Sequence, residues 1–363
     1  MSAPPALAAQ VYTWEPSNAA IARRYGLDPA GILRFDTNTS PTAPPFLAEG
    51  LAGPFEPPLN EYPDSAYEEL VLAAADYFGV PPDEIVVGAG ADEVLDLAAK
   101  AFLPPGGTAI VPLPTYAMYG VLTTQRPARI LAVPRLGPEA GFALDVAAIR
   151  ARLPEAQLVW LCSPNNPTGA AEPRAALQAV LEAAAALPDP PLVVLDEAYH
   201  EFTGETLLDL RGRHPELLVL RTMSKAFALP AIRVGFGIAA RRTIERLERV
   251  RPPGSVATVS AHLATLGLRQ PELARENARR IAAAREDFAA GLAEAGWTPR
   301  PSVTNFVLVQ VGDQAAAEAA AERLLRSGIV PRTFGPANPL RGHLRLTVRS
   351  PEENARLLAA IRG

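Results

Sequence analysis

The chain has 363 residues, enough for two domains of about 100–200 residues each, and its 48% of hydrophobic residues exclude an intrinsically disordered chain. A net charge of -5 gives no reason to expect nucleic acid as a partner. The single cysteine, Cys162, excludes an internal disulfide, and the four scattered histidines argue against a structural metal. Because residues 1–10 lack a basic segment followed by an apolar one and no apolar run reaches about 18 residues, we expect a cytoplasmic, enzyme-sized protein that does not enter the membrane.

The first predicted elements describe an α/β domain. Residues 1–36 are rich in Pro and Ala without apolar periodicity and are predicted to form an arm. A helix is predicted from Ser65 to Phe78, with Asp64 as N-cap and Gly79 as C-terminal stop. Further helices are predicted at Ala91–Phe102 and Glu172–Leu187, and short apolar runs predict strands at Glu84–Gly88, Thr108–Pro112, Gln157–Cys162, Leu192–Asp196, Leu217–Arg221 and Val234–Ala239. Because these runs are continuously apolar, they predict a large domain, residues 37–251, with a mostly parallel sheet sandwiched by helices.

The pattern changes after Pro252 and Pro253. Helices are predicted at Val256–Leu268 and Glu272–Ala295, strands at Asn305–Val311 and His343–Val348, and a final helix from Ser350. Ser350 and Glu353 have the spacing of a capping box, with Pro351 at the first helical position. These elements predict a smaller α+β domain over residues 252–363.

The two lysines of the chain have different surroundings. The 34 basic residues include only Lys100 and Lys225, so the other 32 are arginines. A guanidinium stays protonated, whereas a lysine amine can act as nucleophile or base. Lys100 lies four residues after Asp96 at the end of a predicted helix, which an i,i+4 ion pair explains. Lys225 follows a predicted strand, at the sheet edge where α/β proteins place their sites, and is therefore the candidate catalytic amine.

An imine between Lys225 and a carbonyl cofactor would need an acid, hydroxyl donors, a phosphate cradle and a stacking ring. Residues that offer these functions are Asp196, Tyr199, Asn165 in S-P-N-N-P-T-G, the N–H groups of Ala91 and Asp92 after a glycine turn, Thr222, Ser224, Arg233, and the ring of Tyr116. Three of these residues also have an ordinary explanation: a loop cap or Mg²⁺ ligand for Asp196, a plain turn for Asn165, and a buried ring for Tyr116.

Five motifs occur together in one order and spacing. They are G-A-D-E at 90–93, P-T-Y-A-M-Y at 114–119, C-S-P-N-N-P-T-G at 162–169, D-E-A-Y at 196–199 and R-T-M-S-K-A-F-A-L-x-x-x-R at 221–233. This ensemble resembles the fold-type I pyridoxal-phosphate aminotransferases, and most of all the histidinol-phosphate aminotransferase family, from about Phe35 to Gly363. The resemblance implies a pyridoxal 5′-phosphate enzyme that transfers the amino group of L-histidinol phosphate to 2-oxoglutarate, giving imidazole acetol phosphate and glutamate in histidine biosynthesis.

The resemblance also implies a role for individual residues. Lys225 would hold the cofactor covalently and then act as general base, Asp196 would contact the pyridine nitrogen, Tyr199 and Asn165 the 3-hydroxyl oxygen, and Tyr116 would stack on the ring. The phosphate would be bound by Ala91, Asp92, Thr222, Ser224 and Arg233. Tyr62 would reach the neighbouring subunit's cofactor in a homodimer, while Asn38, Arg332 and Arg345 would bind substrate.

Two departures from the family pattern leave the identity of the substrate open. The N-E-N-P-like segment is Asn38-Thr39-Ser40-Pro41 and lacks the acidic residue, and both Tyr12 and Trp14 are candidates for the substrate-facing aromatic residue of the arm. The alternatives are an aromatic amino-acid aminotransferase or a threonine-phosphate decarboxylase on the same scaffold. A ligand-sensing module fused to a DNA-binding domain is disfavoured, because the roughly 35 residues ahead of the resemblance hold no basic helical segment.

Overall fold

The computed structural model describes residues 16–362, so Tyr12 and Trp14 lie outside the described residues. The α-helices are α1 Asn18–Tyr25, α2 Leu47–Ala52, α3 Glu68–Phe78, α4 Ala91–Phe102, α5 Ala117–Gln125, α6 Val146–Arg152, α7 Arg174–Ala185, α8 Arg241–Glu248, α9 Thr258–Leu268, α10 Pro271–Glu294, α11 Gln314–Arg326 and α12 Pro351–Arg362. The strands are β1 Leu33–Arg34, β2 Ile85–Gly88, β3 Thr108–Leu113, β4 Arg129–Pro134, β5 Leu158–Cys162, β6 Leu192–Asp196, β7 Leu217–Thr222, β8 Gly235–Ala239, β9 Thr298–Pro299, β10 Phe306–Gln310, β11 Ile329–Val330, β12 Arg332–Thr333 and β13 His343–Thr347.

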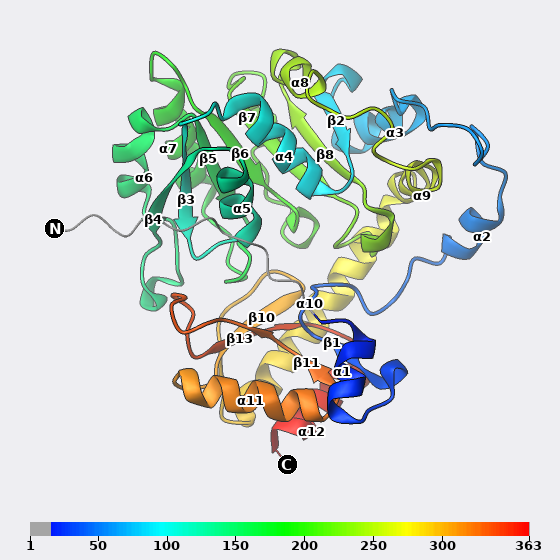
Figure 1. Ribbon diagram of the computed structural model, residues 1–363, viewed down its shortest axis with the longest axis vertical. Coiled ribbons are helices and arrows are strands. Elements are labelled where there is room, and N and C mark those ends of the chain that lie inside the picture. Colours follow the sequence, from blue (N-terminus) through cyan, green and yellow to red (C-terminus); the bar gives the residue numbers. More distant parts are fainter. Residues whose placement is uncertain (1–15, 363) are drawn as a thin grey trace.

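A seven-stranded sheet forms the centre of the larger half of the molecule (Figure 1). Its order is β2-β8-β7-β6-β5-β3-β4, and β8 runs in the direction opposite to the other six strands. Alternate residues of β6 enter two different hydrophobic clusters: Val193 and Leu195 belong to one, Leu192 and Val194 to the other. Both faces of the strand are therefore buried, and the predicted mostly parallel sheet with helices on both faces is confirmed.

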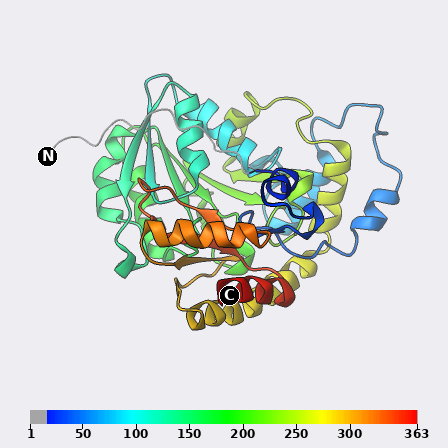
Figure 2. The same cartoon turned by 60° about the horizontal axis from the view of Figure 1, so that its bottom comes forward.

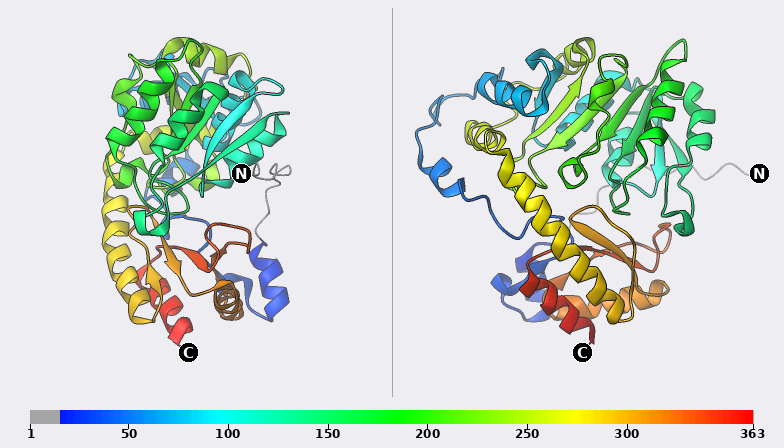
Figure 3. Two further views of the ribbon diagram at one scale, coloured as in Figure 1. Left: turned by 90° about the vertical axis from the view of Figure 1, so that its left-hand side faces the viewer. Right: turned by 180° about the vertical axis from the view of Figure 1, so that it is seen from behind.

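A second, antiparallel sheet has the order β12-β13-β10-β9 and lies with α11 and α12 in the smaller half (Figure 2). The N-terminal residues join this half, because β1 pairs in parallel with β11 and Tyr25 of α1 donates a 2.8 Å hydrogen bond to Glu322 of α11. The long helix α10 runs from the larger half into the smaller one (Figure 3). Helix α9 packs against α3 and α2 of the larger half. The predicted ranges 1–36, 37–251 and 252–363 stay a prediction.

Local signals in the sequence set several helix ends. Ser350 and Glu353 form the predicted capping box, with reciprocal side chain to backbone hydrogen bonds of 3.2 Å each. Gly79 ends α3 in the left-handed conformation, as expected. The start of α3 differs: Asp64 accepts from the N–H groups of Ala66 and Glu68, so it caps a preceding turn and α3 begins at Glu68. No helix within residues 16–362 has the length and apolarity to cross a bilayer.

Candidate active site

The carboxyl ends of adjacent strands converge on one cavity of about 230 Å³. Asp196 ends β6 and Thr222 ends β7, and the loops that follow carry Tyr199, Ser224 and Lys225. Residues that line the cavity include Thr37, Thr39, Ala91, Asp92, Tyr116, Cys162, Asn166, Asp196, Tyr199, Thr222, Ser224, Lys225 and Arg233. Nine of the residues predicted from the sequence are thus brought together, although they are spread from position 91 to position 233.

Lys225 presents its amine inside this cavity. Its Nζ donates a 3.3 Å hydrogen bond to the carbonyl oxygen of Asn38 and lies 5.7 Å from the centre of the Tyr199 ring. Burial, together with the charges of Arg345 and Arg233, lowers the pKa of Lys225 to about 8. At pH 7 about a tenth of this amine is therefore unprotonated and able to react, far more than for an exposed lysine. Lys100, in contrast, forms the predicted ion pair with Asp96 on α4, at 2.5 Å.

Asp196 places a buried carboxylate against the same cavity. Burial raises its pKa, while hydrogen bonds from the Tyr119 hydroxyl at 2.7 Å and the Ala198 N–H at 3.0 Å favour the charged form. Tyr119 was not predicted as a site residue, although its spacing of three residues from Tyr116 allows both rings to face the same side. The thiol of Cys162 is held un-ionised, because burial raises its pKa to about 12.

The N-terminus of α4 offers an anion site at one end of the cavity. Gly90, the N-cap residue, contributes no side chain, so the first N–H groups of α4, beginning at Ala91 and Asp92, have no side-chain cap. Close approach of the backbone requires glycine at Gly235, where a Cβ would lie 2.3 Å from the Ala91 nitrogen. Gly90 has φ +80°, and a Cβ there would lie 2.3 Å from the Arg233 guanidinium and displace it.

Three side chains from the other loops complete this end. The hydroxyls of Thr222 and Ser224 lie 3.0 Å apart, and Arg233 Nη2 is 3.2 Å from Asp92 Oδ2. Backbone N–H groups, two hydroxyls and a guanidinium are donors suited to a phosphate group, so this end of the cavity fits a phosphorylated cofactor. Tyr116 lies beside it and donates from its hydroxyl to Asp92 Oδ1 at 3.0 Å.

Of two neighbouring asparagines, Asn166 lines the cavity and Asn165, the predicted one, does not. Asn165, predicted to face the cofactor's 3-hydroxyl, does not line the cavity: its amide donates to Thr168 and to the Pro114 carbonyl and accepts from Thr115. Asn166 lines the cavity instead. Both residues belong to one tight turn, in which residue type alone does not decide which side chain faces inward.

Two arginines of the smaller half lie on adjacent strands and are not among the residues that line the cavity. Arg345 on β13 and Arg332 on β12 are direct cross-strand partners. Arg345 donates to Asn166 Oδ1 at 2.6 Å and to the Asp36 carbonyl, and its buried Nε has no hydrogen-bond partner within residues 16–362. Burial and the neighbouring Arg332 lower the pKa of Arg345 to about 10. The two guanidiniums form a positive pair suited to an anionic group of a substrate.

Asn38 and Tyr62, two further predicted site residues, differ in their exposure to solvent. Asn38 is buried, and its amide donates to the Tyr199 hydroxyl at 2.9 Å. Tyr62 is 92% exposed and does not line this cavity.

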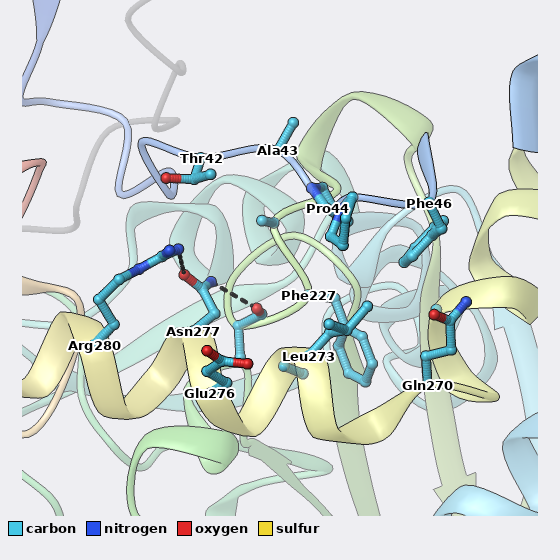
Figure 4. Close-up of a pocket in the computed structure, with 15 residues that line it drawn as sticks. Thr42, Ala43, Pro44, Phe46, Phe227, Gln270, Leu273, Glu276, Asn277 and Arg280 are labelled. Atoms are coloured by element: carbon cyan, nitrogen blue, oxygen red, sulfur yellow. Dashed lines mark hydrogen bonds between the residues drawn. The ribbon is translucent and has the colours of Figure 1, made fainter. Parts of the chain in front are cut away.

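A second pocket of about 200 Å³ lies behind the Lys225 loop, between residues 42–46 and α10 (Figure 4). Its principal polar contact is Asn277, which donates to the Ala226 carbonyl at 2.8 Å and accepts from Arg280 at 2.9 Å. None of the predicted site residues lines this pocket, and the Asn277 hydrogen bond holds the carbonyl of Ala226, the residue after Lys225. Within residues 16–362 no group of three or more His, Cys, Asp or Glu side chains is arranged to hold a metal ion.

The sequence and the fold of this chain were compared with those of known proteins. The sequence profile described as "Aminotransferase class I and II" matches residues 35–361. Histidinol-phosphate aminotransferase 2 of Ralstonia nicotianae is 36% identical, covering 94% of this chain and 91% of the relative, and the histidinol-phosphate aminotransferase of Xylella fastidiosa is 39% identical over 84% of each chain. Among solved structures, the histidinol-phosphate aminotransferase of Sinorhizobium meliloti in complex with pyridoxal-5′-phosphate is similar at a TM-score of 0.86, with 27% identity and coverage of 96% and 95% of the two chains.

Proposed function

The chain belongs to the class I and II aminotransferase family, and we propose that it transfers the amino group of L-histidinol phosphate to 2-oxoglutarate, giving imidazole acetol phosphate and glutamate in histidine biosynthesis. Membership of this family confirms the expected fold-type I architecture and the pyridoxal 5′-phosphate cofactor. The observation that carries the proposal is the Lys225 amine, which lies in one cavity with the Asp196 carboxylate and the uncapped N-terminus of α4. The substrate is supported by the names of relatives 36–39% identical to this chain and by the arginine pair.

The residues of the cavity divide the binding of the cofactor. The N–H groups of Ala91 and Asp92, with Thr222, Ser224 and Arg233, would hold its phosphate, and Asp196 would hold a proton on its ring nitrogen. Tyr116 would cover the ring, and Tyr199 with Asn166 would contact its hydroxyl oxygen, Asn166 taking the place first given to Asn165. When bound, the cofactor supplies an electron-accepting ring that stabilises negative charge at the substrate carbon losing its proton.

Lys225 has two tasks in this proposal. Its amine would hold the cofactor at rest, and when free its Nζ would take up the proton from the substrate carbon next to the amine. The pKa of about 8 suits this base, because it lies close to the pH at which the proton must be both taken up and released. Arg345 and Arg332 would bind the anionic end of the substrate, with Asn38 beside them.

A donor screen tests the substrate. We expect the purified, cofactor-loaded protein to form glutamate from 2-oxoglutarate and histidinol phosphate with a kcat/KM at least about tenfold higher than with phenylalanine or tyrosine. Ready reaction of the aromatic amino acids without reaction of histidinol phosphate would replace the proposal by an aromatic amino-acid aminotransferase. Release of CO₂ from phosphothreonine without a keto acid would replace it by a decarboxylase.

We further propose a homodimer in the cytoplasm. Four large apolar side chains, Leu51, Leu59, Tyr62 and Leu72, are more than half exposed within one stretch of 22 residues, which supports a partner surface there. Tyr62 would contact the cofactor of the partner subunit. The single Cys162 is buried and suits a compartment in which disulfides do not form.

A further inference from the structure

Asn305 precedes β10 and is completely buried, with 0% of its surface exposed. Its Nδ2 donates to the carbonyl oxygen of Asn38 at 2.9 Å, and the same oxygen accepts from Lys225 Nζ at 3.3 Å. Asn305 Oδ1 is buried without a hydrogen-bond partner in the described part of the chain. A buried polar atom without a partner costs stability, so the amide at this position is better explained by its donor than by its acceptor.

The Asn38 carbonyl is held in a specific direction. Asn38 has φ +53°, a left-handed conformation that non-glycine residues populate rarely and keep when surrounding contacts hold it. Its N–H donates to Thr347 Oγ1 at 2.9 Å, its side-chain amide donates to the Tyr199 hydroxyl at 2.9 Å, and its carbonyl accepts from Asn305. Thr347 on β13 and Asn305 just before β10 thus hold the backbone N–H and the backbone carbonyl of Asn38, and the two lie close together because Phe306 pairs with Thr347.

An amine that donates one N–H to a fixed carbonyl has a restricted direction for its remaining hydrogens and lone pair. The carbonyl also favours the protonated form of the amine. Asn305 does not line the cavity and has no hydrogen bond to Lys225, so its influence on the amine passes through Asn38.

We propose that Asn305 is a positioning residue for the transamination: its amide fixes the Asn38 carbonyl as the acceptor that holds the Lys225 amine in its reactive direction. The proposal rests on the proposed function in taking Lys225 as the reacting amine. It extends the site to a residue 80 positions further along the chain, in the smaller half of the molecule.

The charged and titratable groups that act on Lys225 are Asp92, Asp196, Arg233 and Arg345, with the Tyr199 ring beside it. The substitution Asn305→Leu has nearly the same shape and leaves these groups in place, while it removes the donor and the unpartnered oxygen. Thr347→Val, also of similar shape, removes the acceptor of the Asn38 N–H, together with the hydroxyl that donates to the Phe35 carbonyl, and is a second way to release Asn38. Asn354→Leu is the matched control, because Asn354 is buried in the same half and its hydrogen bonds go to the backbone of Arg349.

The test measures the pKa of Lys225 in the full-length, cofactor-free protein. Trace labelling with acetic anhydride across a pH series, followed by peptide mass spectrometry, resolves the lysines one by one, since Lys100 and Lys225 are the only two. We expect Asn305→Leu and Thr347→Val each to lower the pKa of Lys225 by about one unit, because the ammonium loses a well-placed acceptor. The labelling of Lys100 should stay the same in both variants, and Asn354→Leu should change neither lysine.

Steady-state kinetics of the loaded enzyme provide the second readout. Asn305→Leu should lower kcat about tenfold or more and leave the KM of both substrates within about twofold, because Asn305 does not touch the cavity. A Lys225 pKa that is unchanged or higher in the variants would overturn the proposal. If Asn305→Leu does not fold, the Lys225 pKa measured in Thr347→Val decides the outcome. The labelling result does not depend on which donor reacts, so failure of the proposed substrate is distinguishable from failure of this inference.

Discussion

At the scale of the residue, the two lysines show how one side-chain type serves two purposes. Lys100 pairs with Asp96 at a helix surface, where any cation of similar length serves. Lys225 lies in the cavity with its pKa lowered to about 8, where only an amine that can lose its proton serves.

This difference predicts opposite results for the same substitution. Lys225→Arg should lower kcat by about a thousandfold or more, because a guanidinium neither holds the cofactor covalently nor accepts the proton. Lys100→Arg is the matched control and should keep full activity, with the free energy of unfolding within about 0.5 kcal/mol of the unaltered protein. Assay of glutamate formation and urea denaturation measure both effects, and equal activity of the two variants would contradict the assignment.

Asp196 should matter for turnover more than for binding. Asp196→Ala removes the carboxylate that holds the proton on the ring nitrogen, so we expect kcat to fall by about 10²-fold or more while the KM of the amino donor changes little. A variant that loses substrate affinity but keeps kcat would show that Asp196 serves substrate binding instead.

At the scale of the element, the N-terminus of α4 depends on the absence of a side chain at Gly90. A Cβ there would lie 2.3 Å from Arg233 Nη2, and the residue has φ +80°. We expect Gly90→Ala to raise the dissociation constant of pyridoxal phosphate about tenfold or more, measured by spectroscopic titration of the cofactor-free protein.

Gly106→Ala separates backbone strain from lost contact in this experiment. Gly106 has a similar φ of +77°, but nothing lies within 4 Å of the position of its Cβ. This variant should lose stability and keep its cofactor affinity. A comparable loss of affinity in both variants would show that strain alone explains the result at Gly90.

At the scale of the whole molecule, the proposed dimer makes each site depend on both subunits. Tyr62 is exposed on the surface of its own subunit, whereas Lys225 lies inside the cavity. We expect Tyr62→Ala and Lys225→Ala each to be strongly impaired. After subunit exchange between equal amounts, activity should recover to about a quarter of the unaltered value, because half of the dimers are hybrids with one complete site.

A sedimentation experiment on the unaltered protein is the control for this exchange. If the protein is a monomer, or if the mixture is no more active than its two components, the contribution of Tyr62 to a partner's site is ruled out.

The sequence was sufficient for the features that local chemistry decides. The strands of the large sheet are buried on both faces and therefore read as continuous apolar runs, and the capping box of Ser350 and Glu353 is set by four consecutive residues. Strand β4 was not predicted, because it lies at the sheet edge, begins at exposed Arg129 and ends at Pro134.

Contacts between distant segments explain what the sequence left unpredicted. Asn305 and Asn38 are 267 residues apart, and no periodicity relates them. The exchange of Asn165 and Asn166 depends on the path of a tight turn that brings Thr115 and Thr168 onto the first of the two amides. Such choices are made by tertiary packing, which a pattern of residue types does not contain.

The site of covalent attachment shows which amine holds the cofactor. Reduction of the cofactor-loaded protein with borohydride, followed by peptide mass spectrometry, fixes the cofactor to the amine that holds it. We expect one pyridoxyl group per chain, on Lys225, and none on Lys100. Attachment to Lys100, or loaded and active protein without modification of Lys225, would contradict this expectation.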